Sequence, residues 1–291
     1  MINHKLKEKF ILGTAQFGSD YGISNVSGKI DNINLKKIIN FLHLNKIRCL
    51  DIAPVYGNAE ERIGKYNLGS WMVISKYKHV LSKNQKCSLK SEVIKTVKNL
   101  SIPQLHGLLF HDVNDLLGTD GLELYEQSIE LKEKKIINKI GVSIYDDEKL
   151  DELLNKYKMD IIQCPINIID QRLLKSKTLV YLKKLDIEIH ARSVFLQGLL
   201  LASSRIDKIK NNKLKLLHNN WCKWLKNYKT NPIDACISFV LGVKEVDKII
   251  FGIDNFEQLN EILRFQKIEL PLISNDLIIT DKEILQPNLW N

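Results

Sequence analysis

Short apolar runs alternate with amphipathic segments along nearly the whole chain. In the segment 34–45, Leu35, Ile38, Ile39 and Leu42 repeat at the spacing of one helix face. Helices are predicted in the same way at 34–45, 58–66, 89–100, 122–135, 150–157, 179–182, 213–227, from 232 onward, and at 256–264. Segment 9–18 is a short apolar strand that runs into a glycine-bounded loop. Further buried strands are predicted at 47–53, 71–75, 107–110, 139–143, 160–164, 187–191 and 247–252, and the last one at 267–270.

Strands that alternate with helices imply a parallel sheet with helical crossovers. Counted from the strand at 47–53, the repeats number seven, and the segment 267–270 supplies the eighth. This pattern predicts an α/β fold of the (β/α)8 TIM barrel type. An open, doubly wound sheet is the alternative, but no strand runs into a G-x-G-x-x-G phosphate turn. Because no linker or break in composition is visible, we expect residues 1–291 to form a single domain.

Composition and charge exclude some functional classes. The hydrophobic share of 44% and the charged share of 26% are those of a globular protein, and no run approaches the roughly 18 apolar residues of a membrane span. The five cysteines lack C-x-x-C spacing, and two of them, Cys49 and Cys164, lie in apolar strands. We therefore expect a cytoplasmic protein with reduced thiols, bound neither to a membrane nor to a metal.

The net charge of +9 is spread along the chain, although Arg205 to Lys229 is locally basic. We interpret that stretch as the solvated face of a helix and not as a nucleic-acid site, because its aromatic residues Trp221, Trp224 and Tyr228 suit a packed helix face. A basic surface would also suit an anionic cofactor or substrate.

Three polar side chains follow consecutive predicted strands. Asp51, Lys76 and His111 lie at the carboxyl ends of these strands, and Tyr56 lies in the loop after the first of them. Each residue alone has an ordinary structural interpretation, as a turn, solvated or packing residue. In a parallel barrel, however, the carboxyl ends converge on one rim, where active sites are built. The coincidence of four such residues predicts one site.

These residues carry a resemblance to the aldo-keto reductase family. The stretch Asp51-Ile52-Ala53-x-x-Tyr56-Gly57-x-x-Glu60 resembles the family's D-x-A-x-x-Y-G-x-x-E motif. Ile74-Ser75-Lys76 and Leu108-Leu109-Phe110-His111 look like the strands that carry its catalytic lysine and histidine. The resemblance extends from Leu12 to Leu259. It implies a (β/α)8 barrel and NAD(P)H-dependent reduction of a carbonyl group to an alcohol.

The residue types suit carbonyl reduction, which needs a hydride at carbon and a proton at oxygen. Tyr56 would donate the proton, although a phenol with a pKa of about 10 is a poor acid near neutrality. A nearby ammonium favours the phenolate, so we expect Lys76 to lower the pKa of Tyr56. Asp51 would hold Lys76 charged, and a neutral His111 would donate a hydrogen bond to the substrate oxygen.

The resemblance also indicates residues that hold the cofactor. Ser143 and Gln163 match the positions that bind the nicotinamide carboxamide, while Ile144 stands where the family often has asparagine. Arg192 occupies the place of an aromatic residue that stacks on the nicotinamide, and its planar guanidinium could stack there or bind phosphate. Phe195 is a second candidate for this contact, with a core position as the alternative.

At the adenosine end, Gly252, Asp254 and Gln258 belong to the segment that resembles the cofactor-binding turn between the strand at 247–252 and the next helix. A helix N-terminus can receive a phosphate through its free N–H groups. The Lys, Ser and Arg that many relatives use for the 2′-phosphate are replaced by Gly252, Ile253 and Gln258, and Asp254 adds a negative charge. The family preference indicates NADP(H), with NAD(H) as the alternative.

The sequence says less about the substrate. The loop 112–119 is short and the tail after Leu270 shows no barrel-capping pattern, so we expect an open rim that admits a bulky carbonyl substrate, such as a sugar or sugar nucleotide. We expect Arg172 to form a surface salt bridge.

Two alternatives remain open on the sequence. One is a Schiff-base lyase that uses Lys76 as its nucleophile. The other is a non-catalytic nucleotide-binding barrel. The sequence names no surface for oligomerisation.

Overall fold

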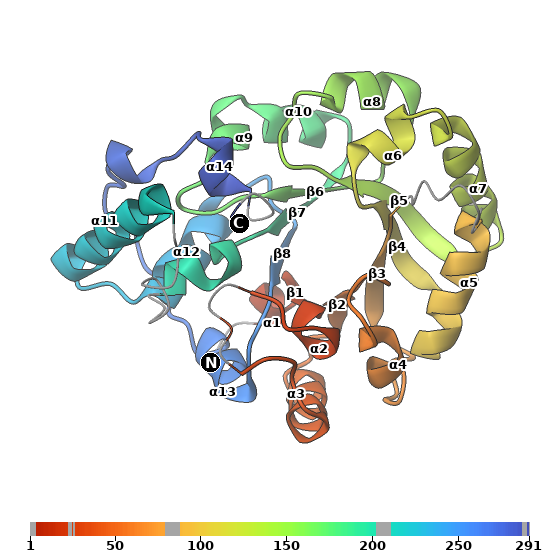
Figure 1. The fold of residues 1–291 in the computed structure, drawn as a ribbon, viewed down its shortest axis with the longest axis horizontal. Helices are drawn as coiled ribbons and strands as arrows, with labels where there is room; N and C mark the ends of the chain where they lie inside the picture. The colour runs from red at the N-terminus through yellow and green to blue at the C-terminus, as the bar shows by residue number, and fades with distance from the viewer. Residues whose placement is uncertain are drawn as a thin grey trace.

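Eight parallel strands close into a barrel in the computed structural model of the protein, which describes residues 4–22, 25, 27–78, 88–201, 211–286 and 290 (Figure 1). The strands follow one another in chain order around the barrel, and the last pairs with the first. This arrangement confirms the predicted (β/α)8 barrel. The strands are β1 Phe10–Gly13, β2 Cys49–Asp51, β3 Met72–Tyr77, β4 Leu105–Phe110, β5 Ile137–Ser143, β6 Ile161–Pro165, β7 Glu188–Arg192 and β8 Lys248–Phe251.

Helices surround the strands and connect them (Figure 1). The α-helices are α1 His4–Lys7, α2 Ala15–Gly18, α3 Asn32–Leu44, α4 Ala59–Ile63, α5 Leu89–Leu100, α6 Val113–Leu117, α7 Gly121–Glu133, α8 Leu150–Lys156, α9 Arg172–Lys175, α10 Thr178–Lys184, α11 Asn212–Tyr228, α12 Pro232–Gly242, α13 Phe256–Ile262 and α14 Lys282–Leu285. Among the described residues, 3₁₀ segments are formed by η1 Leu196–Leu201 and η3 Asn275–Leu277.

The prediction of a last strand at 267–270 is wrong. Those residues carry no strand, and the barrel is closed by β1, which pairs with β2 through Leu12 and Leu50 and with β8 through Phe10 and Ile249. β1 is only four residues long and is followed at once by α2, where a loop was expected. The sequence of so short a strand does not show that β1 pairs with a strand on each side.

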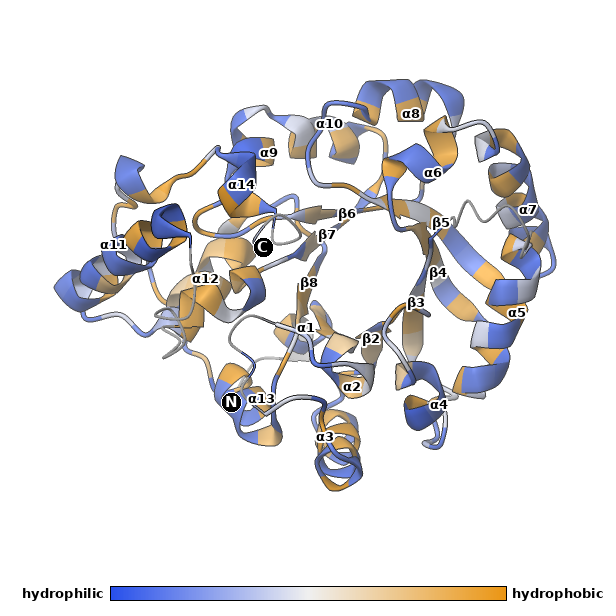
Figure 2. Ribbon diagram, in the orientation of Figure 1, coloured by the Kyte–Doolittle hydropathy of each residue, from blue (hydrophilic) through white to orange (hydrophobic). Residues whose placement is uncertain are grey.

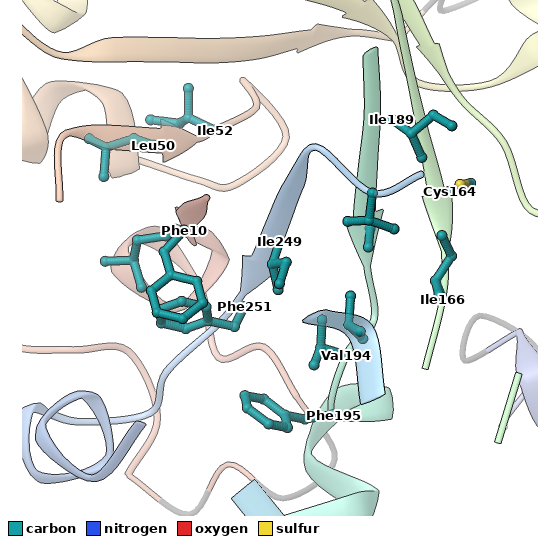
Figure 3. Close-up of a cluster of buried hydrophobic side chains, with 14 of the residues drawn as sticks. Phe10, Leu50, Ile52, Cys164, Ile166, Ile189, Val194, Phe195, Ile249 and Phe251 are labelled. Carbon is teal, nitrogen blue, oxygen red and sulfur yellow. The ribbon is translucent and has the colours of Figure 1, made fainter. Parts of the chain in front are cut away.

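Apolar side chains alternate between two cores. One set points from the strands towards the helices, where Phe10, Leu50, Ile249 and Phe251 gather with residues of the later strands (Figure 3). Phe10 meets Phe251 edge to face, with ring centroids 5.5 Å apart. The intervening residues, among them Ile11 and Ile250, form a separate cluster inside the barrel. The helices turn polar residues outward and apolar residues towards the strands (Figure 2).

Side chains cap the starts of several helices. Asn231 accepts hydrogen bonds from the N–H groups of Ile233 and Asp234 at the start of α12, where Pro232 occupies the first turn. α11 covers the predicted helix at 213–227. The loop 112–119 instead contains α6, whose start is a capping box built by Asp112 and Asp115.

The aromatic residues of α11 are packed, as the interpretation of the basic stretch required. Trp221 is fully buried and stacks on Trp224 with a centroid distance of 5.2 Å, and its Nε1 donates to the Leu200 carbonyl at 2.8 Å. Tyr228 is half-exposed. The part of the basic stretch from 205 to 210 lies outside the described residues. Within the described ranges no helix is long and apolar enough to cross a membrane.

The C-terminal segment lies across the rim of the barrel, although the sequence showed no capping pattern there. The Ile279 N–H donates to the Ile169 carbonyl in the loop after β6 at 3.1 Å. Lys282 in α14 forms ion pairs with Asp146 and Glu148 in the loop after β5. The tail therefore joins two of the loops that border the carboxyl ends of the strands.

Candidate active site

The four residues predicted to form a site lie together at the carboxyl ends of the strands. Asp51 ends β2, Lys76 is the penultimate residue of β3, and His111 follows β4. Tyr56 lies in the loop between β2 and α4. All four line the same pocket. Parallel strands of one barrel bring their ends to one rim, so residues 60 positions apart in the chain meet in space.

A buried ion pair occupies the floor of this pocket. The Lys76 ammonium donates to one oxygen of the Asp51 carboxylate, and the Nε2 amide of Gln163 donates to the other at 2.8 Å. Each of the two charged side chains is about 95% buried or more. Both oxygens of Asp51 therefore have donors, which a buried carboxylate needs in order to remain ionised.

Lys76 connects this pair to Tyr56. Its Nζ lies 3.4 Å from the Tyr56 hydroxyl and 5.6 Å from the centroid of the ring. Burial lowers the pKa of Lys76, but the charge of Asp51, with the polar contacts of Asp51 and Tyr56, outweighs burial, and the net shift is upward. Lys76 is thus an ammonium at neutral pH, which opposes its use as an amine nucleophile.

The pKa of Tyr56 is set by two opposing effects. Burial raises it, whereas the charge and the hydrogen bond of Lys76 lower it, as expected. The net shift is upward because desolvation of the phenolate is the larger effect. Lys76 therefore limits the cost of forming a phenolate in a site that otherwise disfavours it.

His111 is neutral at physiological pH. Burial and the positive charges of Lys76 and Arg192 lower the pKa of its imidazole to about 4. The low pKa agrees with the predicted neutral imidazole, and its cause is desolvation together with the surrounding positive charge. A neutral imidazole can donate one hydrogen bond without adding charge to the site.

The turn that carries Tyr56 packs closely against the backbone at the end of α2. Gly57 has a φ of +60°, and a Cβ at this position would lie 2.3 Å from the Gly18 carbonyl oxygen. Glu60, which the sequence placed in the first turn of a helix, is buried and accepts hydrogen bonds from Thr96 at 2.8 Å and Asn99 at 3.0 Å. The motif residues Gly57 and Glu60 thus fix the position of Tyr56 without lining the pocket.

Ser143, the last residue of β5, and Gln163, within β6, line the same pocket. Both are buried, with exposures of 5% and 1%. The bond from Gln163 to Asp51 was not expected from the sequence. It uses the amide nitrogen and leaves the amide oxygen of Gln163 for another partner.

Arg192 ends β7 and stacks on a neighbouring tyrosine. Its guanidinium carbon lies 4.3 Å from the centroid of the Tyr145 ring, and its terminal nitrogens donate to Ile144 and Ser193, each at 3.1 Å. Ile144 itself is buried and offers only its carbonyl. Phe195 is buried in the apolar core, although it also borders the pocket (Figure 3).

After β8, the strand next to β7, Gly252, Asp254 and Gln258 all contribute to the lining of the pocket. The side-chain oxygen of Gln258 accepts the Asp254 N–H at 2.6 Å, and Asp254 accepts from the Nε2 of Gln16 at 3.4 Å. A Cβ at residue 252 would lie 3.1 Å from the Gln16 amide, so glycine leaves room for that side chain.

Sequence reasoning missed several residues of the pocket. Gln16, Tyr21, Tyr145 and Gln197 all line it. They come from loops after different strands, and no spacing in the sequence marks them. Tyr145 was the one with an available signal, because it lies only two positions after Ser143, the predicted site residue that ends β5.

The expectation of a surface salt bridge at Arg172 is wrong. Arg172 pairs with the buried Asp170 at 2.8 Å and also donates to the Tyr145 carbonyl at 3.0 Å. The Asp170 side chain is only 2% exposed, because the loop after β6 folds inward beneath the C-terminal segment. Across the described ranges, no group of three or more His, Cys, Asp or Glu side chains is placed to hold a metal ion.

Comparison with known proteins identifies the class that this barrel and pocket define. The model of the aldo/keto reductase family matches residues 9–278. The chain belongs to the aldo/keto reductase family, and it is an NAD(P)H-dependent oxidoreductase that acts on carbonyl compounds in the general manner of that family.

Solved structures share the fold at low sequence identity. The aldo-keto reductase AKR11C1 from Bacillus halodurans, in its holo form, is 16% identical with a TM-score of 0.70, over 97% of this chain and 92% of its own. The glycerol dehydrogenase AKR11B4 from Gluconobacter oxydans is 20% identical with a TM-score of 0.67, over 97% and 93%. A comparison with curated proteins gave no match.

Proposed function

We propose that this protein reduces a carbonyl group with Tyr56 as the proton donor and with Asp51, Lys76 and His111 in supporting roles. The observation that carries the proposal is the continuous contact from Asp51 through Lys76 to the Tyr56 hydroxyl, on the floor of one pocket. The buried Tyr56 phenol gives up a proton more readily than it would without Lys76, because the ammonium stabilises the phenolate that forms. Asp51 keeps that ammonium charged and in position.

His111 orients the substrate in this proposal. Because its pKa is about 4, the imidazole is neutral and can donate a hydrogen bond to the carbonyl oxygen. The oxygen would then lie between His111 and Tyr56, where it receives the proton as negative charge develops on it. A single oxygen atom thus receives a hydrogen bond from His111 and a proton from Tyr56, with the positive charge of Lys76 nearby.

The pocket suits a nicotinamide cofactor by the chemistry of its polar groups. Ser143 offers a hydroxyl and Gln163 an unused amide oxygen, which complement the amide of a carboxamide. When bound there, the nicotinamide supplies the hydride. The link from Gln163 to Asp51 would tie the position of the cofactor's ring to the proton-donating group.

We propose NADP(H) as the preferred cofactor, following the family, with NAD(H) as the alternative that Asp254 favours. Asp254 lines the pocket and carries a negative charge, which would repel a 2′-phosphate and could accept a hydrogen bond from a ribose hydroxyl. Gly252 and Gln258, the other two predicted residues, are uncharged. Affinities for NADPH and NADH, measured side by side, decide between the two.

For the substrate we propose a bulky carbonyl compound such as a keto sugar or a sugar nucleotide. The polar lining of the pocket supports this choice, since Tyr21, Tyr145, Gln197 and Ser193 offer several hydrogen-bonding groups around its mouth. Rapid turnover of small apolar aldehydes alone would contradict it. The raised pKa of Lys76 gives no support to the Schiff-base alternative.

One experiment tests the proposed reaction. Purified protein is mixed with NADPH or NADH and a panel of aldehydes, ketones and keto sugars, and cofactor oxidation is followed by absorbance at about 340 nm, where reduced nicotinamide absorbs. Turnover of at least one carbonyl class with formation of the alcohol is expected. Tight cofactor binding without any turnover would instead favour the non-catalytic nucleotide-binding barrel.

A further inference from the structure

Arg192 lines the pocket with most of its hydrogen-bond donors unused. An arginine side chain carries five N–H donors. Arg192 donates one hydrogen bond to the Ile144 carbonyl and one to the Ser193 hydroxyl, so two of the five are used and three remain. Its Nε is buried and has no acceptor among the residues that the structure describes. A buried donor without an acceptor is costly. Of the two arginines whose buried Nε lacks an acceptor among the described residues, only Arg192 lines the pocket.

Arg62 and Arg172, two other arginines with low exposure, use more of their donors than Arg192 does. Arg62 donates from all three of its nitrogens to Asn32 and to the carbonyls of Phe17 and Ile30. Arg172 forms two hydrogen bonds with the carboxylate of Asp170. Arg192 has no carboxylate partner within the described part of the chain. The difference lies in location, because Arg192 alone among the three borders the pocket.

The guanidinium of Arg192 is held in a fixed orientation. One of its faces lies on the ring of Tyr145 at 4.3 Å, and the bond to Ile144 fixes its rotation. Arginine presents a planar fork of donors that matches the two oxygens of a carboxylate or phosphate. A fork that is already positioned loses little conformational entropy when it binds an anion.

The charges around the pocket leave Arg192 uncompensated. The positive charge of Lys76 is balanced by Asp51, whose second oxygen is taken by Gln163. Asp254 follows β8, the strand next to β7, and accepts a hydrogen bond from Gln16. The charge of Arg192 reaches the reacting groups, since it contributes to the lowered pKa of His111.

We propose that Arg192, supported by Tyr145, binds a carboxylate or phosphate group carried by the substrate itself. The proposal rests on the carbonyl reduction proposed above and narrows its substrates to anionic aldehydes and ketones. With the anion on Arg192, the carbonyl oxygen is left for Tyr56 and His111 in the same pocket. Arg192 acts as a specificity residue and takes no part in the proton transfer.

Matched substrate pairs test this assignment. The ratio of kcat/KM is measured for succinic semialdehyde against butanal, and for glyceraldehyde 3-phosphate against glyceraldehyde. The wild-type ratio should favour the anionic member by about tenfold or more, as expected for a charge-assisted hydrogen-bonded pair. Arg192→Gln should lower the ratio by about tenfold, mainly through KM, while Arg192→Lys should keep part of the preference. Using a ratio removes any change that affects both substrates equally.

Arg48 provides a matched control. It is also an arginine with a buried Nε that lacks an acceptor among the described residues, but it precedes β2 at the opposite end of the barrel. Arg48→Gln should leave the ratio unchanged. A fall in the ratio for this variant as large as that for Arg192→Gln would overturn the assignment.

A second measurement separates substrate from cofactor as the source of the anion. NADPH is titrated into wild type and Arg192→Gln and followed by protein fluorescence. Equal affinity supports the proposal, whereas a tenfold weaker affinity with an unchanged substrate ratio assigns Arg192 to a cofactor phosphate and overturns it. A wild-type enzyme that reduces butanal without preferring the anion also overturns it, with the proposed reaction intact. If no carbonyl is turned over, the proposed reaction fails, and calorimetric binding of succinate to wild type but not to Arg192→Gln still decides the inference.

Discussion

The ammonium of Lys76 lies 3.4 Å from the hydroxyl of Tyr56, although the two residues come from different strand–loop units of the barrel. Burial alone would make Tyr56 a very weak acid, and Lys76 is the nearby group that opposes this effect most strongly. The pair is therefore the first place at which the proposed chemistry can be tested.

Replacing Tyr56 by phenylalanine removes the proposed proton donor and preserves the ring. We expect kcat to fall by about 10²- to 10⁴-fold, the range typical of a lost general acid. Cofactor affinity should change little, because the ring contact with Lys76 is retained. Steady-state kinetics and NADPH titration provide the two measurements. Tyr21→Phe alters another tyrosine of the pocket and should lose only a few-fold; equal losses in both variants would remove the special role of Tyr56.

Asp51→Asn leaves the Lys76 ammonium buried without its counter-charge. Breaking a buried pair in this way typically costs about 3–5 kcal/mol, so we expect the free energy of unfolding to fall by about 3 kcal/mol. Adding Lys76→Met removes the stranded charge and should restore part of the loss. Urea denaturation of the two single variants and the double variant measures this coupling. Strictly additive losses would mean that the two side chains do not stabilise each other.

His111 predicts a dependence of stability on pH. Its pKa falls from 6.5 to about 4 on folding, so between these values the unfolded chain binds a proton that the folded chain does not. Stability should therefore decrease as the pH falls from 6.5 to 4, and this contribution should level off below 4. In His111→Gln the decrease should be smaller by about 2 kcal/mol, allowing for partial exposure of the ring. Urea denaturation at pH 4.5 and 7 tests the difference; the same slope in both proteins would contradict it.

Asp254 should influence the choice between the two cofactors. Asp254→Ser removes a negative charge from the pocket and should raise the affinity for NADPH relative to NADH by about tenfold, or about 1.4 kcal/mol. Glu257→Gln is the control, because Glu257 is exposed and does not line the pocket. Fluorescence titration of both cofactors gives the ratio. An unchanged ratio in Asp254→Ser would place the 2′-position of the cofactor away from this carboxylate.

Gly57→Ala should disturb the position of Tyr56 from outside the pocket. The residue has a φ of +60°, and a Cβ would lie 2.3 Å from the Gly18 carbonyl oxygen. We expect a loss of about 1–3 kcal/mol in stability together with a reduced kcat. Gly242→Ala is the control, since a Cβ there meets nothing within 4 Å. Thermal unfolding and steady-state kinetics are measured for both variants. If Gly57→Ala lost no more stability and kcat than Gly242→Ala, the prediction would be wrong.

Much of the barrel could be predicted because its signals are local. The helix spacing of Leu35 to Leu42 depends on a few neighbouring residues, and the helix predicted there is confirmed. The role of β1 depended on contacts with β2 and β8, which a run of four residues does not encode. The strand expected at 267–270 was the consequence, since one more strand was needed to complete eight.

The predicted site residues line one pocket, as expected, because the sequence marks where the strands end and the carboxyl ends of a parallel barrel meet at one rim. Their partners are not predictable in the same way. The bond from Gln163 to Asp51 and the stack of Arg192 on Tyr145 depend on side-chain rotamers and on loops after different strands. The inward turn of Arg172 towards Asp170 likewise depends on the path of a loop, which polarity alone predicted to be at the surface.

The pairing of β1 with β8 has a consequence for the synthesis of the protein. Phe10 in β1 pairs with Ile249 in β8, which lies near the other end of the chain. During synthesis, β1 therefore leaves the ribosome long before β8 has been made. Until Phe251 has been made, the growing sheet has two open edges, and such edges pair readily with other chains. Closure of the ring is therefore a late event, and a nascent chain that stalls before β8 is the species most in need of a chaperone.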